Sequence, residues 1–487
     1  MTSNVHISVT LTDALQVQQL AHLPVCVNLI EVRTDAFNAD LKEIKKATGV
    51  ALLFALKSKV EGGFFTGSVK LRVREFVNAS AVYDFFELEA ERDLVPEILN
   101  IIPPEKRIIS WQGNTENYEA LKNRFERYRA TPARYYRLVI QAIRSGDELP
   151  VLQLLEKQNR SDLIAYATGP VGLWTQPLSA FLGSPVVPST LNREININHF
   201  SHKQLIENYN LPGIYPVKKF FGIVGNPVFG SISPKLHNAA FRALKLPYLY
   251  LPFHANSLSE FFDEVVNRNM PVIELSGLTV VSPFKEAGFK TAGKINDPDV
   301  MVSEACNILM NQKNSGWAAM STDASGVINA LNKMDTTWNL KNIVVIGCGG
   351  TGRTVAAALK RMKVKFTLVN RTVDKGNKIA KALQLPFIAL DKFNPAAFEI
   401  IIHATPLGKN KGELPFDITL LKQGSVVIDH VYALPEETDL VKYCRLCNIP
   451  VVDGVEMAEI QIKHQFKLMT AMEMISVQKE EPLLKIK

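Results

Sequence analysis

Three glycines between residues 347 and 352 form a motif with a defined chemical use. They follow the apolar run Asn342–Ile346 and precede TVAAALKRM, a stretch typical of a helix, with the spacing G-x-G-x-x-G. Between a strand and a helix, the first glycine permits a tight turn, the second lets the backbone approach a pyrophosphate, and the helix N-terminus offers N–H groups to it. The sequence therefore predicts a dinucleotide site at Gly347, Gly349, Gly350, Thr351 and Gly352.

A cationic turn follows the next predicted strand, Lys365–Val369. It consists of Asn370, Arg371 and Thr372, with Lys375 one helical turn later. A carboxylate at this place holds the ribose 2′-hydroxyl of NAD, whereas a guanidinium suits the 2′-phosphate of NADP. We therefore predict NADP as the cofactor, the alternative being a solvated basic turn.

A pair of serines supplies a second possible binding element. Ser231 and Ser233 are one residue apart, and Pro234 can open a helix directly after them. Two hydroxyls at this spacing can point at one carboxylate, so we expect an anionic substrate here.

Eight apolar runs in the first 200 residues must position any chemistry of the N-terminal half. They are His6–Leu11, Val25–Val32, Ala51–Lys57, Tyr83–Leu88, Arg107–Trp111, Tyr135–Ile140, Leu163–Thr168 and Val186–Pro188. Most are rich in β-branched or aromatic residues, and most intervals have room for a helix, which predicts an α/β fold with a (β/α)8 barrel, although periodicity alone does not exclude an open sheet. Polar residues fall at the ends of these strands, where barrel enzymes keep their chemistry: Glu31, Arg33, Lys57, Glu87, Glu89 and Gln112.

The pattern changes at Asn208–Lys219, where Pro, Gly and Lys indicate a domain junction. A second α/β pattern begins with the predicted strand Phe220–Val224, and a third begins at Lys341. A chain of 487 residues is too long for one core, so we expect two or three domains.

Composition excludes several classes of protein. The net charge of +7 is mild and its Lys and Arg residues are scattered, so we expect no nucleic-acid partner. We expect no signal peptide, no membrane span and no metal site. Five cysteines suit a reducing cytoplasm. Cys444 and Cys447 form one C-x-x-C, which we interpret as two half-buried thiols rather than a zinc or redox site.

From about Lys218 onward the chain resembles the shikimate dehydrogenase family. Six motifs occur in family order: Gly277–Lys285 (GLTVVSPFK, for G-x-N-V-T-x-P-x-K), Asn307 in A-x-N, Ser321–Asp323 (for N-T-D), His403–Gly408 (HATPLG, for N-A-T-P-L-G), Asp429–Tyr432 (D-x-V-Y), and Asp453–Met457 with Gln461. The resemblance implies a substrate-binding domain over 216–325, completed by 455–487, and a Rossmann NADP-binding domain over 326–454.

The same resemblance implies roles for individual residues. Lys285 and Asp323 would form the catalytic pair that protonates the alkoxide while NADPH reduces the C3 ketone of 3-dehydroshikimate. Substrate contacts would come from Ser231, Ser233, Asn307, Tyr432 and Gln461, and Gly454 would lie at the cofactor.

Three residues depart from the family pattern. Val281 replaces a substrate-binding Thr, Thr279 replaces Asn or Ser, and His430 replaces an apolar residue near the nicotinamide. Loss of one neutral hydrogen bond costs about 0.5–1.5 kcal/mol, which weakens or redirects substrate choice without abolishing the chemistry. Quinate therefore stays open as an alternative substrate.

The first 215 residues resemble type I 3-dehydroquinate dehydratase, the enzyme that makes dehydroshikimate. The matching segments are Glu31–Asp35 (EVRTD, for E-x-R-x-D), Lys57–Gly63 (KSKVEGG, including Glu61), Ser110–Gln112 and Tyr136–Leu138. However, Arg137 stands at the Schiff-base lysine and Gln112 at the catalytic histidine. Thr175-Gln176 replaces the S-R pair that clamps the substrate carboxylate in that family, and the family's final A-P-G-Q loop is unrecognisable around Leu191–Asn196.

These substitutions predict an impaired dehydratase. The pKa of an arginine side chain lies so far above 7 that roughly one Arg in ten million is unprotonated at pH 7, so Arg137 cannot act as the amine nucleophile. Losing the histidine alone should cost roughly 10²–10⁴-fold. A relocated nucleophile at Lys57 is one alternative, and a barrel kept as scaffold, dimerisation surface or ligand-binding module is favoured.

The leading hypothesis is therefore an NADP-dependent shikimate dehydrogenase fused to an impaired dehydratase. A fully bifunctional enzyme is the second hypothesis. The third is a non-catalytic sensor of NADP and a cyclohexane carboxylate, against which the retention of both Lys285 and Asp323 argues. The sequence leaves the oligomeric state open.

Overall fold

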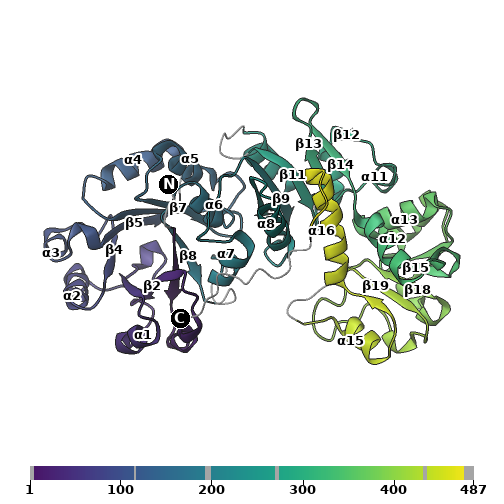
Figure 1. The fold of residues 1–487 in the computed structure, drawn as a ribbon, viewed down its shortest axis with the longest axis horizontal. Coiled ribbons are helices and arrows are strands. Elements are labelled where there is room, and N and C mark those ends of the chain that lie inside the picture. Colours follow the sequence, from purple (N-terminus) through teal and green to yellow (C-terminus); the bar gives the residue numbers. More distant parts are fainter. Residues whose placement is uncertain (1–4, 115–116, 192–198, 269–273, 432–435, 476–487) are drawn as a thin grey trace. The chain divides into compact units, whose positions relative to one another are not determined.

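The structure is a computed structural model that describes residues 5–114, 117–191, 199–268, 274–431 and 436–475 (Figure 1). The chain divides into two compact units. The first comprises residues 1–220, 238–274 and 476–487, and the second comprises 221–237 and 275–475.

Eight parallel strands form the centre of the first unit. They pair in sequence order from β1 to β7, and β8 pairs with the other edge of β1, which gives a nearly closed barrel. The predicted (β/α)8 barrel is confirmed. The strands are β1 (His6–Leu11), β2 (Val27–Arg33), β3 (Ala51–Ala55), β4 (Phe85–Glu89), β5 (Arg107–Gly113), β6 (Tyr135–Gln141), β7 (Leu163–Thr168) and β8 (Val186–Thr190).

Helices follow most of these strands and surround the barrel (Figure 1). They are α1 (Leu41–Thr48), α2 (Val69–Ala79), α3 (Pro96–Leu99), α4 (Tyr118–Tyr128), α5 (Leu149–Gln158), α6 (Thr175–Phe181) and α7 (His202–Tyr209), with short η1 (Ala14–His22), η2 (Lys59–Glu61) and η3 (Pro104–Lys106). Several begin at a side-chain cap. Ser68 accepts a hydrogen bond from the Leu71 amide at the start of α2, for example, which satisfies a backbone donor that the helix itself leaves unpaired.

The strand period places the barrel's polar residues. Leu29, Leu53, Ile108, Ile164 and Val186 belong to one buried apolar cluster. Because side chains on one face recur at every second residue, residues two or four positions further along the same strands project from the same face. These are Glu31, Arg33, Gln112, Tyr166, Thr168 and Pro188, and Lys57 follows two residues after the end of β3.

The first unit also contains β10 (Tyr248–His254), α9 (Leu258–Phe261) and a π-helical turn, η4 (Phe262–Val266). Helix α8 (Ser233–Ala243) begins in the second unit and continues into the first.

The second unit contains a mixed sheet in which β9 (Lys219–Gly225), β11 (Leu275–Val280), β13 (Ile308–Asn311), β14 (Trp317–Met320) and β12 (Lys294–Ile295) follow one another. Strand β13 is antiparallel to both of its neighbours. Three helices continue from loops at this sheet: α10 (Lys285–Thr291), α11 (Pro298–Ser303) and α12 (Asp323–Met334).

A parallel six-stranded sheet completes the second unit in the order β17-β16-β15-β18-β19-β20. This is the Rossmann strand order, which places a crevice at the carboxyl ends of β15 and β18, where the order reverses. Its strands are β15 (Ile343–Ile346), β16 (Phe366–Asn370), β17 (Phe387–Ala389), β18 (Ile400–His403), β19 (Val426–Asp429) and β20 (Val451–Val452). The helices around them are α13 (Gly350–Arg361), α14 (Val373–Leu383) and α15 (Asp439–Leu446), with the short turns η6 (Trp338–Leu340), η7 (Leu390–Lys392), η8 (Pro395–Ala397) and η9 (Ile418–Leu420). A further short turn, η5 (Lys313–Ser315), joins β13 and β14 of the mixed sheet.

Alternation along β15 builds a core on each face of this sheet. Ile343 and Val345 join one apolar cluster, and Val344 and Ile346 join another. Cys444 and Cys447, at the end of α15, are free thiols.

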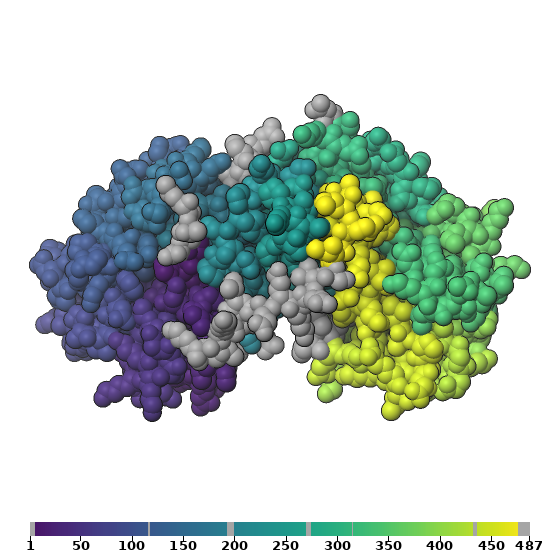
Figure 2. Space-filling model, in the orientation of Figure 1, coloured from purple at the N-terminus to yellow at the C-terminus, as the bar shows by residue number. Residues whose placement is uncertain are grey.

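The last described helix, α16 (Gly454–Thr470), packs against α12, β11 and β19. In Figure 2 its yellow surface lies beside green segments from the middle of the chain. Among the described helices, none combines the length and the apolar character that a membrane crossing requires.

Candidate active site

The glycine turn after β15 has the shape that a dinucleotide requires. Gly347 has a φ of +111°, which favours glycine, and a Cβ on Gly352 would stand 1.9 Å from the Gly347 carbonyl oxygen. Gly349 precedes α13 with no side-chain cap, and a Cβ there would meet open space. The turn thus leaves room at a helix N-terminus for a pyrophosphate, so the residues fit such a cofactor.

Lys285 and Asp323 lie in direct contact beside this turn. Lys285 is the first residue of α10 and Asp323 the first of α12. The Lys285 Nζ atom donates to Asp323 Oδ2 at 2.6 Å and to Thr351 Oγ1 at 2.7 Å. A Cβ on Gly350 would stand 2.9 Å from the Lys285 Cβ. The glycine turn therefore packs directly on the lysine.

Two amides hold the other oxygen of Asp323. Asn307 Nδ2 donates to Asp323 Oδ1 at 2.9 Å, and Gln461 Nε2 donates to the same oxygen at 3.2 Å. The carboxylate is 2% exposed, and three donors from different elements fix its orientation. The structure thus brings together Lys285, Asp323, Asn307, Gln461 and Thr351.

Behind Asp323 the contacts continue to a residue that departs from the family pattern. Thr322 Oγ1 accepts from Asn307 Nδ2 at 3.0 Å and from Gln465 Nε2 at 3.3 Å. Thr279 Oγ1 in turn donates to Gln465 Oε1 at 3.2 Å. Thr279, which stands where the family has Asn or Ser, is therefore part of the buried hydrogen-bond network that supports the site. Gln465 was missed from the sequence, although it lies one helical turn after Gln461 and so shares its face of α16.

The serine pair lies at the beginning of α8. Ser231 Oγ accepts a hydrogen bond from the Ser233 amide at 3.2 Å, and no described residue accepts a hydrogen bond from the Ser231 hydroxyl. Val281, after β11, contacts the start of this loop, because a Cβ on Gly225 would stand 2.3 Å from Val281 Cγ2.

The predicted cofactor residues after β16 are arranged around Asn370. Its Oδ1 accepts from the Cys348 amide at 3.1 Å and its Nδ2 donates to the Thr372 carbonyl at 2.8 Å. Arg371, Thr372 and Lys375 are exposed. Gly454 is the buried first residue of α16. Tyr432 lies outside the described residues.

One cation at the glycine turn was missed from the sequence. Arg353, one residue after the last glycine, pairs through Nη2 with Glu286 Oε1 at 2.7 Å, and Lys375 Nζ lies 3.9 Å from the same oxygen. Its place in the first turn of α13 was visible in the sequence, but its partner on α10 could not be inferred from spacing.

Two histidines occupy the crevice end of the Rossmann sheet. His403 Nδ1 lies 2.9 Å from Asp429 Oδ1, and its Nε2 lies 2.6 Å from Thr405 Oγ1. Burial lowers the pKa of His430 to about 4, while the charges of Asp323 and Lys285 act on it in opposite directions. His430 is therefore neutral at pH 7.

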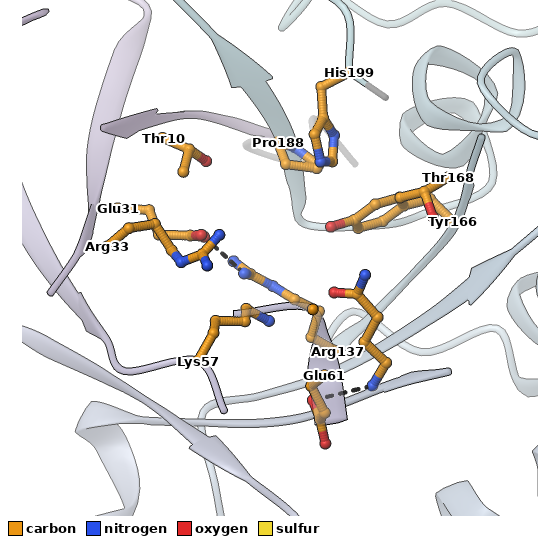
Figure 3. A pocket seen from close by; sticks show the side chains of 12 residues that line it. Thr10, Glu31, Arg33, Lys57, Glu61, Arg137, Tyr166, Thr168, Pro188 and His199 are labelled. Carbon is orange, nitrogen blue, oxygen red and sulfur yellow. Dashed lines mark hydrogen bonds and ion pairs between the residues drawn. The ribbon is translucent and has the colours of Figure 1, made fainter. Parts of the chain in front are cut away.

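A second polar site lies in the barrel, at the carboxyl ends of its strands. The cavity there has a volume of about 140 Å³. Figure 3 shows Arg137 at its centre, between Glu31 and Tyr166. The cavity is lined by Thr10, Glu31, Arg33, Lys57, Glu61, Gly62, Gln112, Arg137, Tyr166, Thr168, Pro188 and His199. Of the polar residues predicted at the strand ends, Glu31, Arg33, Lys57 and Gln112 line the cavity, as do Glu61 and Arg137 from the dehydratase-like motifs, whereas Glu87 and Glu89 do not.

The charges of this cavity are paired crosswise. Arg137 Nη1 donates to Glu31 Oε2 at 2.7 Å and to Glu87 Oε2 at 3.3 Å. Lys57 Nζ donates to Glu87 Oε1 at 2.8 Å, and Arg33 forms a two-bond pair with Asp35 at 2.8 and 2.7 Å. Burial alone would lower the pKa of Lys57, but Glu87 and Glu31 outweigh it and raise that pKa above its ordinary value.

Two titratable residues of the cavity lining, Glu61 and His199, are mainly uncharged at neutral pH. Burial raises the pKa of Glu61 to about 8, and Glu61 Oε2 accepts from the Gln112 amide at 3.2 Å. Burial lowers the pKa of His199 to about 4. His199, which the sequence did not indicate, lies 3.1 Å through Nδ1 from Nε2 of Gln176, the residue that replaces the arginine of the clamp. Of Leu191–Asn196, only Leu191 is within the described residues.

A lysine–carboxylate pair against a Rossmann glycine turn, preceded by a (β/α)8 barrel, defines a class: a nucleotide-dependent oxidoreductase fused to a (β/α)8 barrel domain. Three family models match the chain: type I 3-dehydroquinase over residues 5–216, the shikimate dehydrogenase substrate binding domain over 223–309, and shikimate / quinate 5-dehydrogenase over 329–409. The chain belongs to the shikimate dehydrogenase family, joined to a type I 3-dehydroquinase domain.

The chain is also similar to individual proteins. A shikimate dehydrogenase (NADP(+)) of Thermococcus kodakarensis is 32% identical over 259 residues, which cover 52% of this chain and 91% of that protein. A chloroplastic bifunctional 3-dehydroquinate dehydratase/shikimate dehydrogenase of Arabidopsis thaliana is 26% identical over 477 residues, 91% of this chain and 78% of that protein. A crystal structure of shikimate dehydrogenase from Aquifex aeolicus is 27% identical, covers 54% of this chain and 96% of its own, and has a TM-score of 0.49.

Proposed function

We propose that this chain is an NADP-dependent shikimate dehydrogenase of the shikimate pathway, which interconverts 3-dehydroshikimate and shikimate. The observation that carries the proposal is the contact of Lys285 Nζ with Asp323 at 2.6 Å and with Thr351 of the glycine turn at 2.7 Å. A group able to donate a proton is thereby held next to the loop that fits the cofactor.

When bound, NADPH supplies the hydride. Lys285 donates a proton from Nζ to the oxygen that becomes the alcohol, and its positive charge stabilises the developing alkoxide. Asp323 orients the ammonium, and Asn307 and Gln461 hold Asp323 in place through Oδ1. Ser231 and Ser233 bind the ring carboxylate, and Val281 at the base of their loop contributes apolar contact where the family has a hydroxyl.

NADP is favoured over NAD because the turn after β16 carries Arg371 and Lys375 and no carboxylate between residues 370 and 373. Both cations are exposed and can meet a 2′-phosphate, which forms strong charge-assisted hydrogen bonds with a guanidinium. The relative from Thermococcus kodakarensis, which is described as a shikimate dehydrogenase (NADP(+)), supports the same preference.

For the barrel, we propose that the Schiff-base dehydratase chemistry is lost. Arg137 is a permanent cation whose pKa burial would lower but Glu87 and Glu31 raise, and Lys57 is an ammonium held by Glu87. Neither supplies a free amine. Gln112 does not titrate. His199 is the imidazole of the cavity and is held at Nδ1 by Gln176.

We propose domain limits of 1–215 for the barrel, 216–325 with 455–487 for substrate binding and 326–454 for NADP binding. A cytoplasmic location is proposed on cysteine usage alone.

Two experiments test these proposals. Purified chain with NADP and either shikimate or quinate is followed at the reduced-nicotinamide absorbance band; folded protein that reduces NADP with neither would favour the sensor hypothesis. Incubation with dehydroquinate and borohydride, followed by peptide mass analysis, tests the barrel. A reduced adduct on Lys57, or on any other barrel lysine, would overturn the proposed loss.

A further inference from the structure

The barrel cavity contains an arginine with one edge unused. Arg137 is 2% exposed, and its contacts with Glu31 and Glu87 both run through Nη1. Among the described residues, none accepts a hydrogen bond from its Nε or Nη2, although both atoms are buried. Buried guanidinium donors are normally satisfied, so this edge is suited to a bound acceptor.

The size of the cavity limits what that acceptor can be. Its volume is about 140 Å³, and an engineered cavity of about 150 Å³ in another protein holds benzene. Arg137 reaches its middle in Figure 3, with Tyr166 and His199 on one side and Lys57 on the other. The space beside the guanidinium therefore fits a body about as large as a six-membered ring.

The lining supplies mainly hydrogen-bond donors. Lys57 Nζ has three N–H groups, one of which is used by Glu87. Burial raises the pKa of Tyr166 above its usual range, so its hydroxyl keeps its proton. Glu61, with a pKa of about 8, carries a proton at neutral pH and does not repel an anion. The cations Arg33, Lys57 and Arg137 are balanced by the carboxylates of Asp35, Glu87 and Glu31. Because the cavity has no excess positive charge, a ligand must bind through acceptors that match these donors in geometry.

An Nε–Nη2 edge presents two parallel N–H groups, the arrangement that two oxygens of one carboxylate accept. We propose that the barrel cavity binds a small carboxylate, held side-on by the Nε–Nη2 edge of Arg137. The residue that removes the Schiff-base nucleophile becomes the centre of an anion site. This inference rests on the proposed loss of dehydratase chemistry only in that Arg137 binds and does not react.

The test uses the full chain and 4-fluorobenzoate, whose binding in solution is followed by fluorine NMR. We expect binding to the unaltered chain and to Arg134→Lys, a matched change of an exposed arginine just before the same strand. Arg137→Lys keeps the buried positive charge but loses the two parallel N–H groups of the Nε–Nη2 edge, and should weaken binding of 4-fluorobenzoate at least tenfold. Equal affinity in Arg137→Lys would overturn the proposal, as would equally strong competition by inorganic phosphate.

A second measurement does not depend on the variant folding. A crystal of the unaltered chain soaked with 4-bromobenzoate locates the probe by bromine scattering, and a carboxylate beside Arg137 is the expected result. A probe found only beside Ser233 belongs to the dehydrogenase and overturns the inference. Shikimate oxidation, assayed in parallel, reports on the proposed dehydrogenase alone, and a borohydride-reduced lysine adduct reports on the proposed dehydratase loss alone.

Discussion

Lys285 in the second unit and Lys57 in the barrel are both partly or fully buried amines next to a carboxylate, yet their surroundings differ. The Lys285 side chain is 15% exposed and bonds Asp323 and a hydroxyl. Lys57 is 9% exposed at its side chain and bonds Glu87, which Arg137 also contacts. In the second unit neutral amides complete the carboxylate's contacts, whereas in the barrel a permanent cation does so.

This difference leads us to assign proton transfer to the site in the second unit and ligand binding to the barrel cavity. We propose that Lys285 transfers a proton, since it is the only cation among the described residues that pairs with Asp323 and the glycine turn lies against it. In the barrel, three cations and their carboxylates fix one another, so the ammonium of Lys57 is stabilised in its charged form. We propose that this arrangement binds a ligand and supplies no nucleophile.

The largest effect is expected from removing the amine in the second unit. Lys285→Met keeps an unbranched side chain of similar shape but removes the ammonium group that we expect to transfer the proton. The kcat for shikimate oxidation should therefore fall roughly 10²–10⁴-fold. Steady-state kinetics with NADP measures this. Lys290→Met, in the same helix and exposed, is the matched control and should behave as the unaltered chain. Comparable rates in both variants would remove Lys285 from the mechanism.

A smaller effect should follow from separating the lysine and the cofactor turn. Gly350→Ala places a Cβ 2.9 Å from the Lys285 Cβ and 3.0 Å from its Cδ, which displaces the ammonium. A misplacement of about 1 Å can cost up to roughly 100-fold in rate, so we expect a loss of about 10- to 100-fold, mainly in kcat. Gly293→Ala, where the nearest atom lies at 3.8 Å, is the control. An unchanged kcat in Gly350→Ala would show that the contact is not needed.

Much of this comparison could be predicted from the sequence. Strand positions followed from apolar periodicity, and β1 and β7 have the predicted limits. The Rossmann crevice followed from glycine spacing, and the pairing of Lys285 with Asp323 followed from resemblance. These signals are local or carried by motifs.

Contacts that no sequence motif indicates could not be predicted. Arg353 meets Glu286 across 67 positions of the chain, and Gln176 meets His199 through a fold-dependent approach. The free edge of Arg137 depends on which nitrogen its two carboxylates reach, a detail of packing that residue type does not specify.

The cofactor turn gives a third way to sharpen the comparison. Arg371→Ala removes a cation that we expect at the 2′-phosphate. A hydrogen bond to a charged group is worth roughly 1.5–3 kcal/mol, and Arg371 is exposed, so kcat/KM for NADP should fall about 10-fold while that for NAD stays constant. Lys378→Ala, on the exposed side of α14, should change neither. A parallel loss with both coenzymes would assign Arg371 to the stability of the turn.

The smallest expected effect concerns the barrel's protonated carboxyl. Burial raises the pKa of Glu61 from 4.5 to about 8, so between these values the folded chain binds more protons than the unfolded chain, and stability falls as pH rises through this window. Glu61→Gln can still accept from the Gln112 amide but does not titrate. We therefore expect its Tm, measured by circular dichroism, to match the unaltered chain near pH 5 and exceed it by a few degrees near pH 9. Exposed Glu105, changed to Gln, controls for the loss of a charge. Parallel Tm curves for the unaltered chain and Glu61→Gln would mean that Glu61 is ionised in the folded barrel, which would add a repelling charge to the cavity and weaken the case for an anionic ligand beside Arg137.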